Sequence, residues 1–230
     1  MQDLERADLD LHRRLIGPMK LGSSPDVRAA LVTASEGSFD SGFIRDEWHL
    51  IIDARGVATA GSCRELPRLG GCVRVPVTRR DAAWAIFARA RADLDAQGLT
   101  TRAEMVHRLA AHLVIRPKGA SWSHVVVEEA QDISVAELKA VAAVAGLRPN
   151  GLFFAGDVGQ RILRQAFPWA SVGVDVRRRS GSLKVCYRTS RQIRDRSDRL
   201  LPLRLTEADG SEEERCGIFS VFEGLEPDFH

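Results

Sequence analysis

The octapeptide VVVEEAQD at residues 125–132 is the stretch that decides the fold class. Three β-branched residues followed at once by two carboxylates are typical of a strand that is buried on both faces and ends at a polar edge. Two more short runs, Leu152 to Phe154 and Leu183 to Val185, are followed within three residues by polar residues. The intervening segments are long enough for helical crossovers. The pattern therefore predicts an α/β fold.

The segment between the first two runs carries clear helix signals. Ser134 and Glu137 form an S-x-x-E capping box, and Gly146 is placed to end the helix. In open α/β sheets, ligands bind beyond the carboxyl ends of the strands. We therefore expect the three strands to bring three polar clusters to one rim. The clusters are Glu128-Glu129 with Gln131 and Asp132, Gly156-Asp157 with Gln160, and Tyr187-Arg188.

The adjacent carboxylates Glu128 and Glu129 suit phosphoryl transfer. One carboxylate at a strand end can hold Mg²⁺, directly or through water, while its neighbour orients the attacking water. The alternative is that Glu128, Glu129 and Asp132 form only a solvated acidic helix start. The wider pattern of the chain is needed to choose between these interpretations.

Three segments together resemble helicase motifs II, III and IV of the UvrD/Rep-like superfamily 1 DNA helicases. They are VVVEEAQD at 125–132, FFAGDVGQRI at 153–162 and LKVCYRTSRQI at 183–193, and they occur in the family's order. The resemblance implies an incomplete RecA-like P-loop NTPase lobe with a mainly helical insertion subdomain. It also implies ATP and Mg²⁺ as cofactors, and 3′ to 5′ translocation on single-stranded or partly duplex DNA.

The resemblance assigns catalytic roles residue by residue. Glu129 matches the general base for water, Gln160 the residue that senses the γ-phosphate, and Arg188 the arginine that neutralises charge on it. A glutamine can donate to a phosphate oxygen while accepting from water, and a guanidinium matches phosphate oxygens with two parallel donors.

Four more positions receive roles from the same resemblance. Tyr187 would stack near the adenine, and Asp157 matches the residue that links the nucleotide site to the DNA contacts. Glu128 stands where the family has its Mg²⁺-associated aspartate. Trp169 lies where the family has residues that stack on single-stranded bases, although packing in the core is an equally good interpretation of this residue.

The resemblance also suggests how the chain is organised. Residues 1–36 are expected to be an N-terminal helical segment of uncertain placement, and residues 37–120 a helical insertion subdomain (1B-like). Residues 121–200 would be the C-terminal part of the first RecA-like lobe (1A), and residues 201–230 the truncated start of the second lobe. Within this scheme we expect a turn at residues 22–25, a helix over residues 43–52, and helix starts at Thr78 and at Thr100 or Thr101.

The sequence departs from the family in ways that predict low activity. None of the four lysines stands in the Gly-Lys-Ser or Gly-Lys-Thr triplet of a phosphate loop. Glu128 replaces an aspartate, and Cys186 replaces an asparagine. We therefore expect little or no ATP turnover from the chain alone. It is then a truncated gene model of a longer helicase, a non-enzymatic remnant that binds DNA or a partner, or part of a split ATPase. The last of these would need an exposed apolar surface beside the strands at Val125 and Leu152.

Composition limits the remaining possibilities. The net charge of +2 gives no global positive field, so any nucleic-acid contact must be local. The four cysteines lack the spacing of a zinc site or a disulfide framework. Neither a signal sequence nor a membrane-spanning apolar run is visible. A soluble, cytoplasmic protein without a membrane partner is the expectation.

Overall fold

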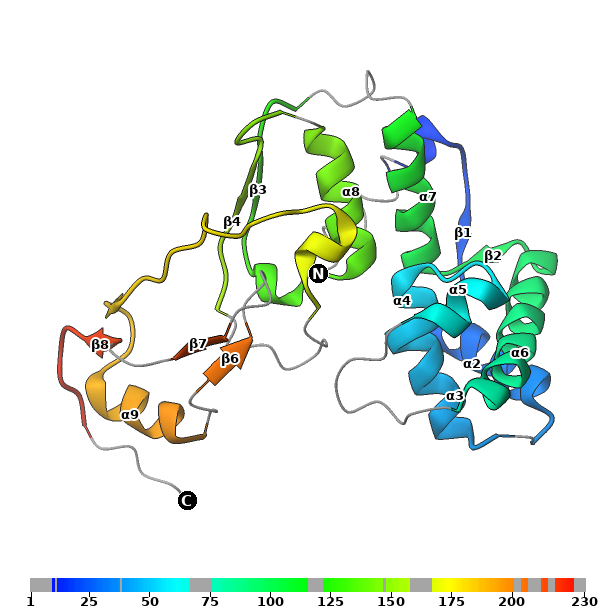
Figure 1. Ribbon diagram of the computed structural model, residues 1–230, viewed down its shortest axis with the longest axis horizontal. Helices are drawn as coiled ribbons and strands as arrows, with labels where there is room; N and C mark the ends of the chain where they lie inside the picture. The colour runs from blue at the N-terminus through cyan, green and yellow to red at the C-terminus, as the bar shows by residue number, and fades with distance from the viewer. Residues whose placement is uncertain are drawn as a thin grey trace. The chain divides into compact units, whose positions relative to one another are not determined.

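A computed structural model describes residues 10, 12–37, 39–66, 76–115, 122–146, 148–157, 167–200, 204–206, 212–214 and 218–225. The chain forms two compact units, residues 1–155 and residues 156–230. The described elements are mostly helices with short strands, as Figure 1 shows. At this level the predicted mixed α/β class is confirmed.

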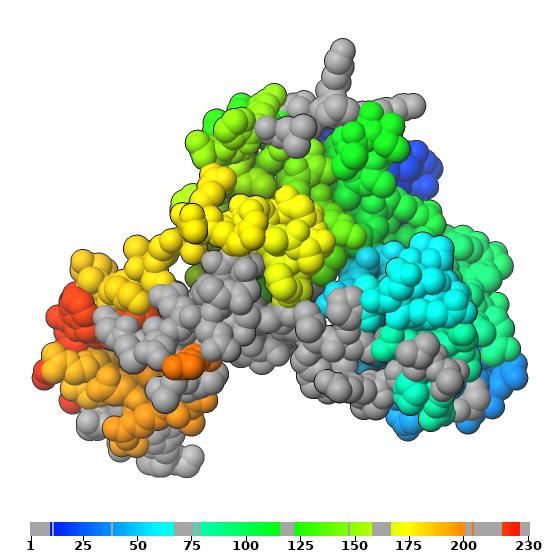
Figure 2. Space-filling model, in the orientation of Figure 1, coloured from blue at the N-terminus to red at the C-terminus, as the bar shows by residue number. Residues whose placement is uncertain are grey.

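The first part of unit 1 is a helical cluster. It comprises α2 (Ser24–Ser35), α3 (Ser41–Glu47), the π-helix η1 (Trp48–Ile52), α4 (Asp53–Arg55), α5 (Ala60–Glu65) and α6 (Val77–Ala96). The predicted helix over residues 43–52 is confirmed as α3 continued by η1. The fully buried rings of Trp48 and Phe87, whose centroids are 6.0 Å apart, lie in its core. Figure 2 shows α5, in cyan, packed against α6.

Helix α2 begins where the sequence predicted a turn. Ser23 accepts a hydrogen bond from the backbone N–H of Asp26, whose side chain accepts one from the backbone N–H of Ser23. This is a capping box with aspartate in place of glutamate. Pro25 suits the first turn of a helix, where its missing N–H costs nothing. The turn prediction is therefore wrong, and α2 shares the core of α3 and α6.

Of the two helix starts predicted after residue 75, the structure contradicts one and confirms the other. Pro76, and not Thr78, occupies the N-cap position of α6, so that prediction is wrong. The start at Thr101 is confirmed, because its Oγ1 accepts a hydrogen bond of 3.1 Å from the N–H of Glu104 in α7 (Arg102–Ile115). Just before α7, β2 (Leu99–Thr100) pairs in parallel with β1 (Lys20–Leu21).

The second part of unit 1 holds the predicted parallel strands. β3 (Val125–Val127) pairs in parallel with β4 (Leu152–Phe154), with Val127 opposite Phe154. The 3₁₀ turn η3 (Ala130–Asp132) and α8 (Val135–Ala145) follow β3. The capping box of Ser134 and Glu137 is confirmed, as is the stop at Gly146, where φ is +63°. Apolar side chains join α7 to α8; the buried ones are Met105, Val106, Ala110, Ala136 and Ala140.

Unit 2 contains η5 (Trp169–Val172), β5 (Val185–Cys186), α9 (Arg191–Leu200), β6 (Arg204–Thr206), β7 (Glu212–Glu214) and β8 (Phe219–Ser220). β5 pairs in parallel with β8, and β6 pairs antiparallel with β7. Among the described residues, β5 therefore does not extend the β3–β4 sheet, contrary to the prediction of three strands with one rim. None of the described helices has both the length and the apolar character needed to cross a membrane.

Candidate functional site

The two glutamates form a short outward loop at the end of the β3–β4 pair. The N–H of Ala155 donates to the carbonyl of Val127 at 2.9 Å, and the carbonyl of Ala155 accepts from the N–H of Ala130, also at 2.9 Å. These two hydrogen bonds of Ala155 lie on either side of Glu128 and Glu129, which are not part of the β3–β4 ladder. Both glutamates of this loop are exposed.

Glu129 has an unusual backbone conformation. Its φ and ψ are 52° and 40°, in the left-handed region that residues with a side chain seldom adopt. Such conformations cost about 1–3 kcal/mol and cluster at active sites and ligand clamps. The observed geometry makes Glu129 the strongest functional candidate in this unit.

A buried amide holds the carboxylate of Glu129 in place. Nε2 of Gln131 donates to Oε2 of Glu129 at 2.6 Å, and Gln131 itself is buried. An anchored donor of this kind fixes the orientation of a base without filling both of its oxygens. The sequence placed Gln131 in the polar cluster but gave it no role. Its position two residues after the glutamate was the only signal.

The helix after the loop is firmly tied to α7. Oε2 of Glu137 accepts from the N–H of Ser134 at 2.8 Å, while its Oε1 accepts from Arg102 at 3.3 Å. One carboxylate therefore both caps α8 and links it to the start of α7. This arrangement gives the loop of Glu128 and Glu129 a rigid support.

The loop satisfies only a minimal requirement for Mg²⁺. This ion is usually bound through one or two carboxylates together with water and substrate phosphates, and Glu128 and Glu129 supply that number. Within the described ranges, no group of three or more histidine, cysteine, aspartate or glutamate side chains is gathered to hold a metal. The residues present therefore fit a Mg²⁺ ion that arrives with a phosphate ligand, with Glu128 as the residue that would hold it.

The other predicted site residues belong to unit 2. Asp157 is exposed and is the third residue after β4. Tyr187, which is 75% exposed, and Arg188, also exposed, directly follow β5. Gln160 lies outside the described residues. The structure therefore groups Glu128 with Glu129 in one unit, and Tyr187 with Arg188 in the other.

Trp169 does not match its predicted DNA contact. Its side chain is only 5% exposed, and its carbonyl accepts a hydrogen bond of 3.2 Å from the N–H of Val174 at the end of η5. A ring can stack on a base only if one of its faces is accessible. The placement favours the packing interpretation, and we drop Trp169 as a DNA-binding residue.

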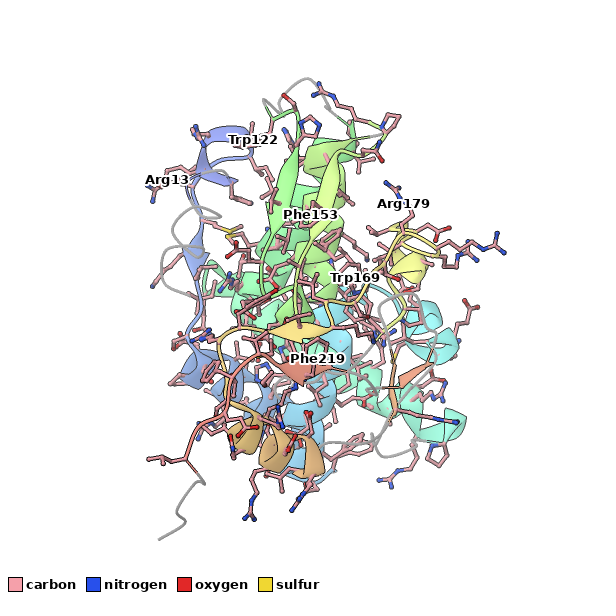
Figure 3. All side chains as sticks on the ribbon, turned by 90° about the vertical axis from the view of Figure 1, so that its left-hand side faces the viewer. Arg13, Trp122, Phe153, Trp169, Arg179 and Phe219 are labelled. Atoms are coloured by element: carbon pink, nitrogen blue, oxygen red, sulfur yellow. The ribbon has the colours of Figure 1, made fainter. Side chains whose placement is uncertain are left out.

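One face of the β3–β4 sheet is apolar and exposed. Val126 is 66% exposed and Phe153 is 63% exposed, whereas α8 packs behind β3. Figure 3 shows Phe153 on the outer side of the strands. The prediction of strands buried on both faces is therefore wrong for this pair. Parallel sheets usually have both faces covered, so the exposed face is a candidate contact surface.

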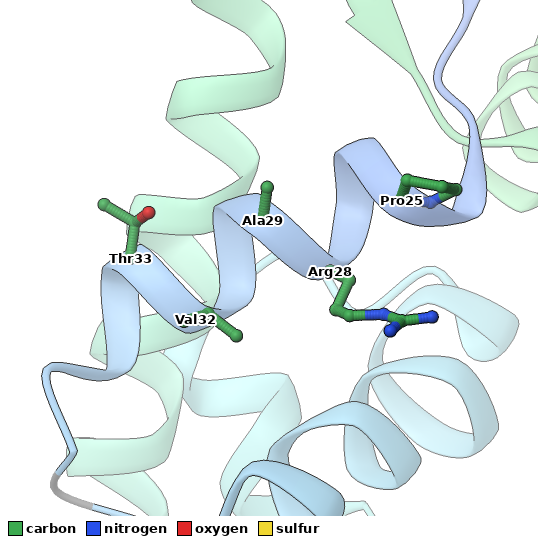
Figure 4. Close-up of a pocket in the computed structure, with 5 residues that line it drawn as sticks. All are labelled: Pro25, Arg28, Ala29, Val32 and Thr33. Atoms are coloured by element: carbon green, nitrogen blue, oxygen red, sulfur yellow. The ribbon is translucent and has the colours of Figure 1, made fainter.

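A hollow of about 430 Å³ lies on α2, away from the candidate site residues. Figure 4 shows its lining by Pro25, Arg28, Ala29, Val32 and Thr33, all from this one helix. Ligand sites are normally concave and bring several polar groups together. This open surface offers one guanidinium and one hydroxyl, so it does not compete with the loop of Glu128 and Glu129.

The chain was compared with known proteins for independent indications of function. No protein-family model matches it. No curated protein matches it either.

Proposed function

We propose that the chain is part of an ATP-dependent DNA helicase of the UvrD/Rep type, which couples ATP hydrolysis to 3′ to 5′ translocation on single-stranded DNA. The observation that carries the proposal is the conformation of Glu129. It lies directly beyond a parallel strand pair, in a left-handed backbone conformation, with its carboxylate anchored by Gln131. Strained, anchored carboxylates at strand ends suit a general base.

In the proposed mechanism, Glu129 accepts a proton from the attacking water while Gln131 keeps its carboxylate oriented. Glu128 would hold Mg²⁺, which neutralises charge on the phosphates when it is bound. Gln160 would contact the γ-phosphate and Arg188 would balance its charge. Tyr187 would stack near the adenine, and Asp157 would link the nucleotide site to DNA.

A second candidate function is that of a non-enzymatic binding module derived from such a helicase. Two observations favour it. The 230 residues contain no Gly-Lys-Ser or Gly-Lys-Thr triplet, and a phosphate loop uses this lysine to reach the β- and γ-phosphates. The exposed Val126 and Phe153 also provide an apolar surface that a partner polypeptide would cover.

Steady-state ATP hydrolysis tests whether the chain alone has ATPase activity. We expect the purified chain to show no turnover above that of its Glu129→Gln variant, in the presence of Mg²⁺ and with or without single-stranded DNA. The reason is that no lysine is placed to hold the phosphates. Turnover that DNA stimulates and that Glu129→Gln abolishes would refute the inactivity of the chain. It would also show that phosphates are held by other residues.

A further inference from the structure

Cys186 lies at the end of β5, on the face of the β5–β8 pair that also carries Ser220. The two residues are directly paired across the parallel strands. Paired residues of neighbouring strands point to the same face. Helix α9, which starts at Arg191, packs against β8. The thiol therefore sits in unit 2 between a strand end and the first turn of a helix.

Several donors surround the sulfur. Backbone N–H groups of Thr189 and Arg188 donate to it, as do the Thr189 hydroxyl and the Arg194 side chain. Hydrogen bonds of this kind favour the thiolate over the thiol. They lower the pKa of Cys186 from 9.0 to about 7, with the N–H of Thr189 as the largest cause. Two of these donors belong to arginines, Arg188 in the loop after β5 and Arg194 on α9, and Arg194 is also paired with Asp198 at 3.3 Å.

Two serine hydroxyl groups in this part of unit 2 are buried without a partner. Ser220 and Ser190 are each only 5% exposed, and neither Oγ has a hydrogen-bond partner in the part of the chain that the structure describes. A buried hydroxyl left unpaired destabilises the fold. Ser190 is also tightly enclosed, since a Cβ built on Gly224 would lie 2.7 Å from its Oγ. Ser220 is paired with Cys186, and Ser190 directly follows the loop whose N–H groups donate to the sulfur, so the two free hydroxyls are candidate donors to an oxygen atom added there.

We propose that Cys186 is a peroxide-reactive thiol whose sulfenic acid is stabilised by the hydroxyl groups of Ser220 and Ser190. The thiolate sulfur attacks one oxygen of hydrogen peroxide and forms a sulfur–oxygen bond, while the oxygen–oxygen bond breaks and hydroxide leaves. The sulfur loses two electrons and the peroxide gains them. This inference concerns unit 2 alone and does not rest on the proposed helicase function.

The test is oxidation of the intact chain by hydrogen peroxide, followed by dimedone capture of sulfenic acid and peptide mapping. Cys186 should be labelled at least about tenfold faster than Cys63, which is 1% exposed on α5 and serves as an internal control. The label at this position should disappear in Cys186→Ser. Equal labelling of the two cysteines, or none at Cys186, would overturn the proposal.

The role of the hydroxyl groups is tested with Ser220→Ala and, separately, Ser190→Ala. Each variant should leave less dimedone-reactive sulfenic acid and more sulfinic acid at the same peroxide dose, because the first oxidation product loses a donor. Circular dichroism checks that each variant is folded, and either folded variant is sufficient for the test. An unchanged ratio of sulfenic to sulfinic acid in the folded variants would refute the role of the serines.

Discussion

The wild-type chain is expected to lose about 3 kcal/mol of stability as the pH rises from about 4 to 6, because Asp53 ionises in this range. Replacing Asp53 with asparagine is expected to abolish this loss. Asp53 is 7% exposed, and burial raises the pKa of its carboxyl from 3.8 to about 6. The hydrogen bond of 2.6 Å from Thr101 and the charge of Arg91 oppose this rise but do not cancel it. The folded state therefore favours the protonated carboxyl.

The direction of the pH effect follows from this raised pKa. In the window between the two pKa values the folded chain binds more protons at Asp53 than the unfolded chain does. The contribution of Asp53 to the free energy of unfolding is therefore complete below about pH 4 and is lost as the pH rises through about 6. An asparagine does not titrate, and its side-chain oxygen can still accept from the Thr101 hydroxyl.

Urea unfolding of both proteins across this pH range measures the effect. The free energy of unfolding of Asp53→Asn, relative to wild type, should rise by about 3 kcal/mol between pH 4 and pH 6. The difference between the two proteins removes the titration of all other groups. A difference that stays constant with pH would mean that burial does not raise the pKa of the Asp53 carboxyl.

Glycine at position 129 is expected to stabilise the fold relative to glycine at position 128. Glu129 is in the left-handed region, where a residue with a side chain costs about 1–2 kcal/mol and glycine costs little. Glycine also loses more backbone entropy on folding than other residues, which costs about 0.5–1 kcal/mol of stability. Glu128, which is not among the positive-φ residues, should show only that second effect.

Glu129→Gly should therefore have a free energy of unfolding about 1–2 kcal/mol higher than that of Glu128→Gly. Chemical denaturation of the two variants, with wild type as reference, measures this difference. The residues are neighbours and both are exposed, and a Gln131→Ala background in both variants removes the hydrogen bond that only Glu129 accepts. Equal stabilities would show that Glu129 is not strained, and would remove the main support for its role as a base.

Local signals in the sequence predicted the centre of unit 1 well. The capping box of Ser134 and Glu137, the cap at Thr101 and the parallel pair β3–β4 are all present. The two caps depend on residues within a few positions of one another, and β3 and β4 are joined by a single helical crossover. The capping box at Ser23 was not predicted, because Asp26 replaces the usual glutamate and the surrounding Gly and Pro indicated a turn.

Long-range features were less predictable. The pairing of β5 with β8 joins residues more than 30 positions apart, and nothing in the apolar run at Leu183 specifies its partner. The exposure of Phe153 depends on what covers one sheet face, which an apolar run does not encode. Trp169 suits both a core and a stacking surface, so burial had to come from the structure. The strain at Glu129 is a backbone property with no signature in residue type.

Binding to single-stranded DNA is the measurement that bears most directly on a helicase origin. Residues 177–204 hold ten lysine or arginine residues against two acidic ones, which is the local positive charge that phosphate contacts require. Fluorescence anisotropy with labelled oligo(dT) and a duplex of equal length compares the two ligands as salt rises from about 50 to 200 mM. We expect the single strand to bind more tightly than the duplex, with an affinity that falls steeply with salt. No binding at low salt, or equal binding of single strand and duplex, would contradict the proposal.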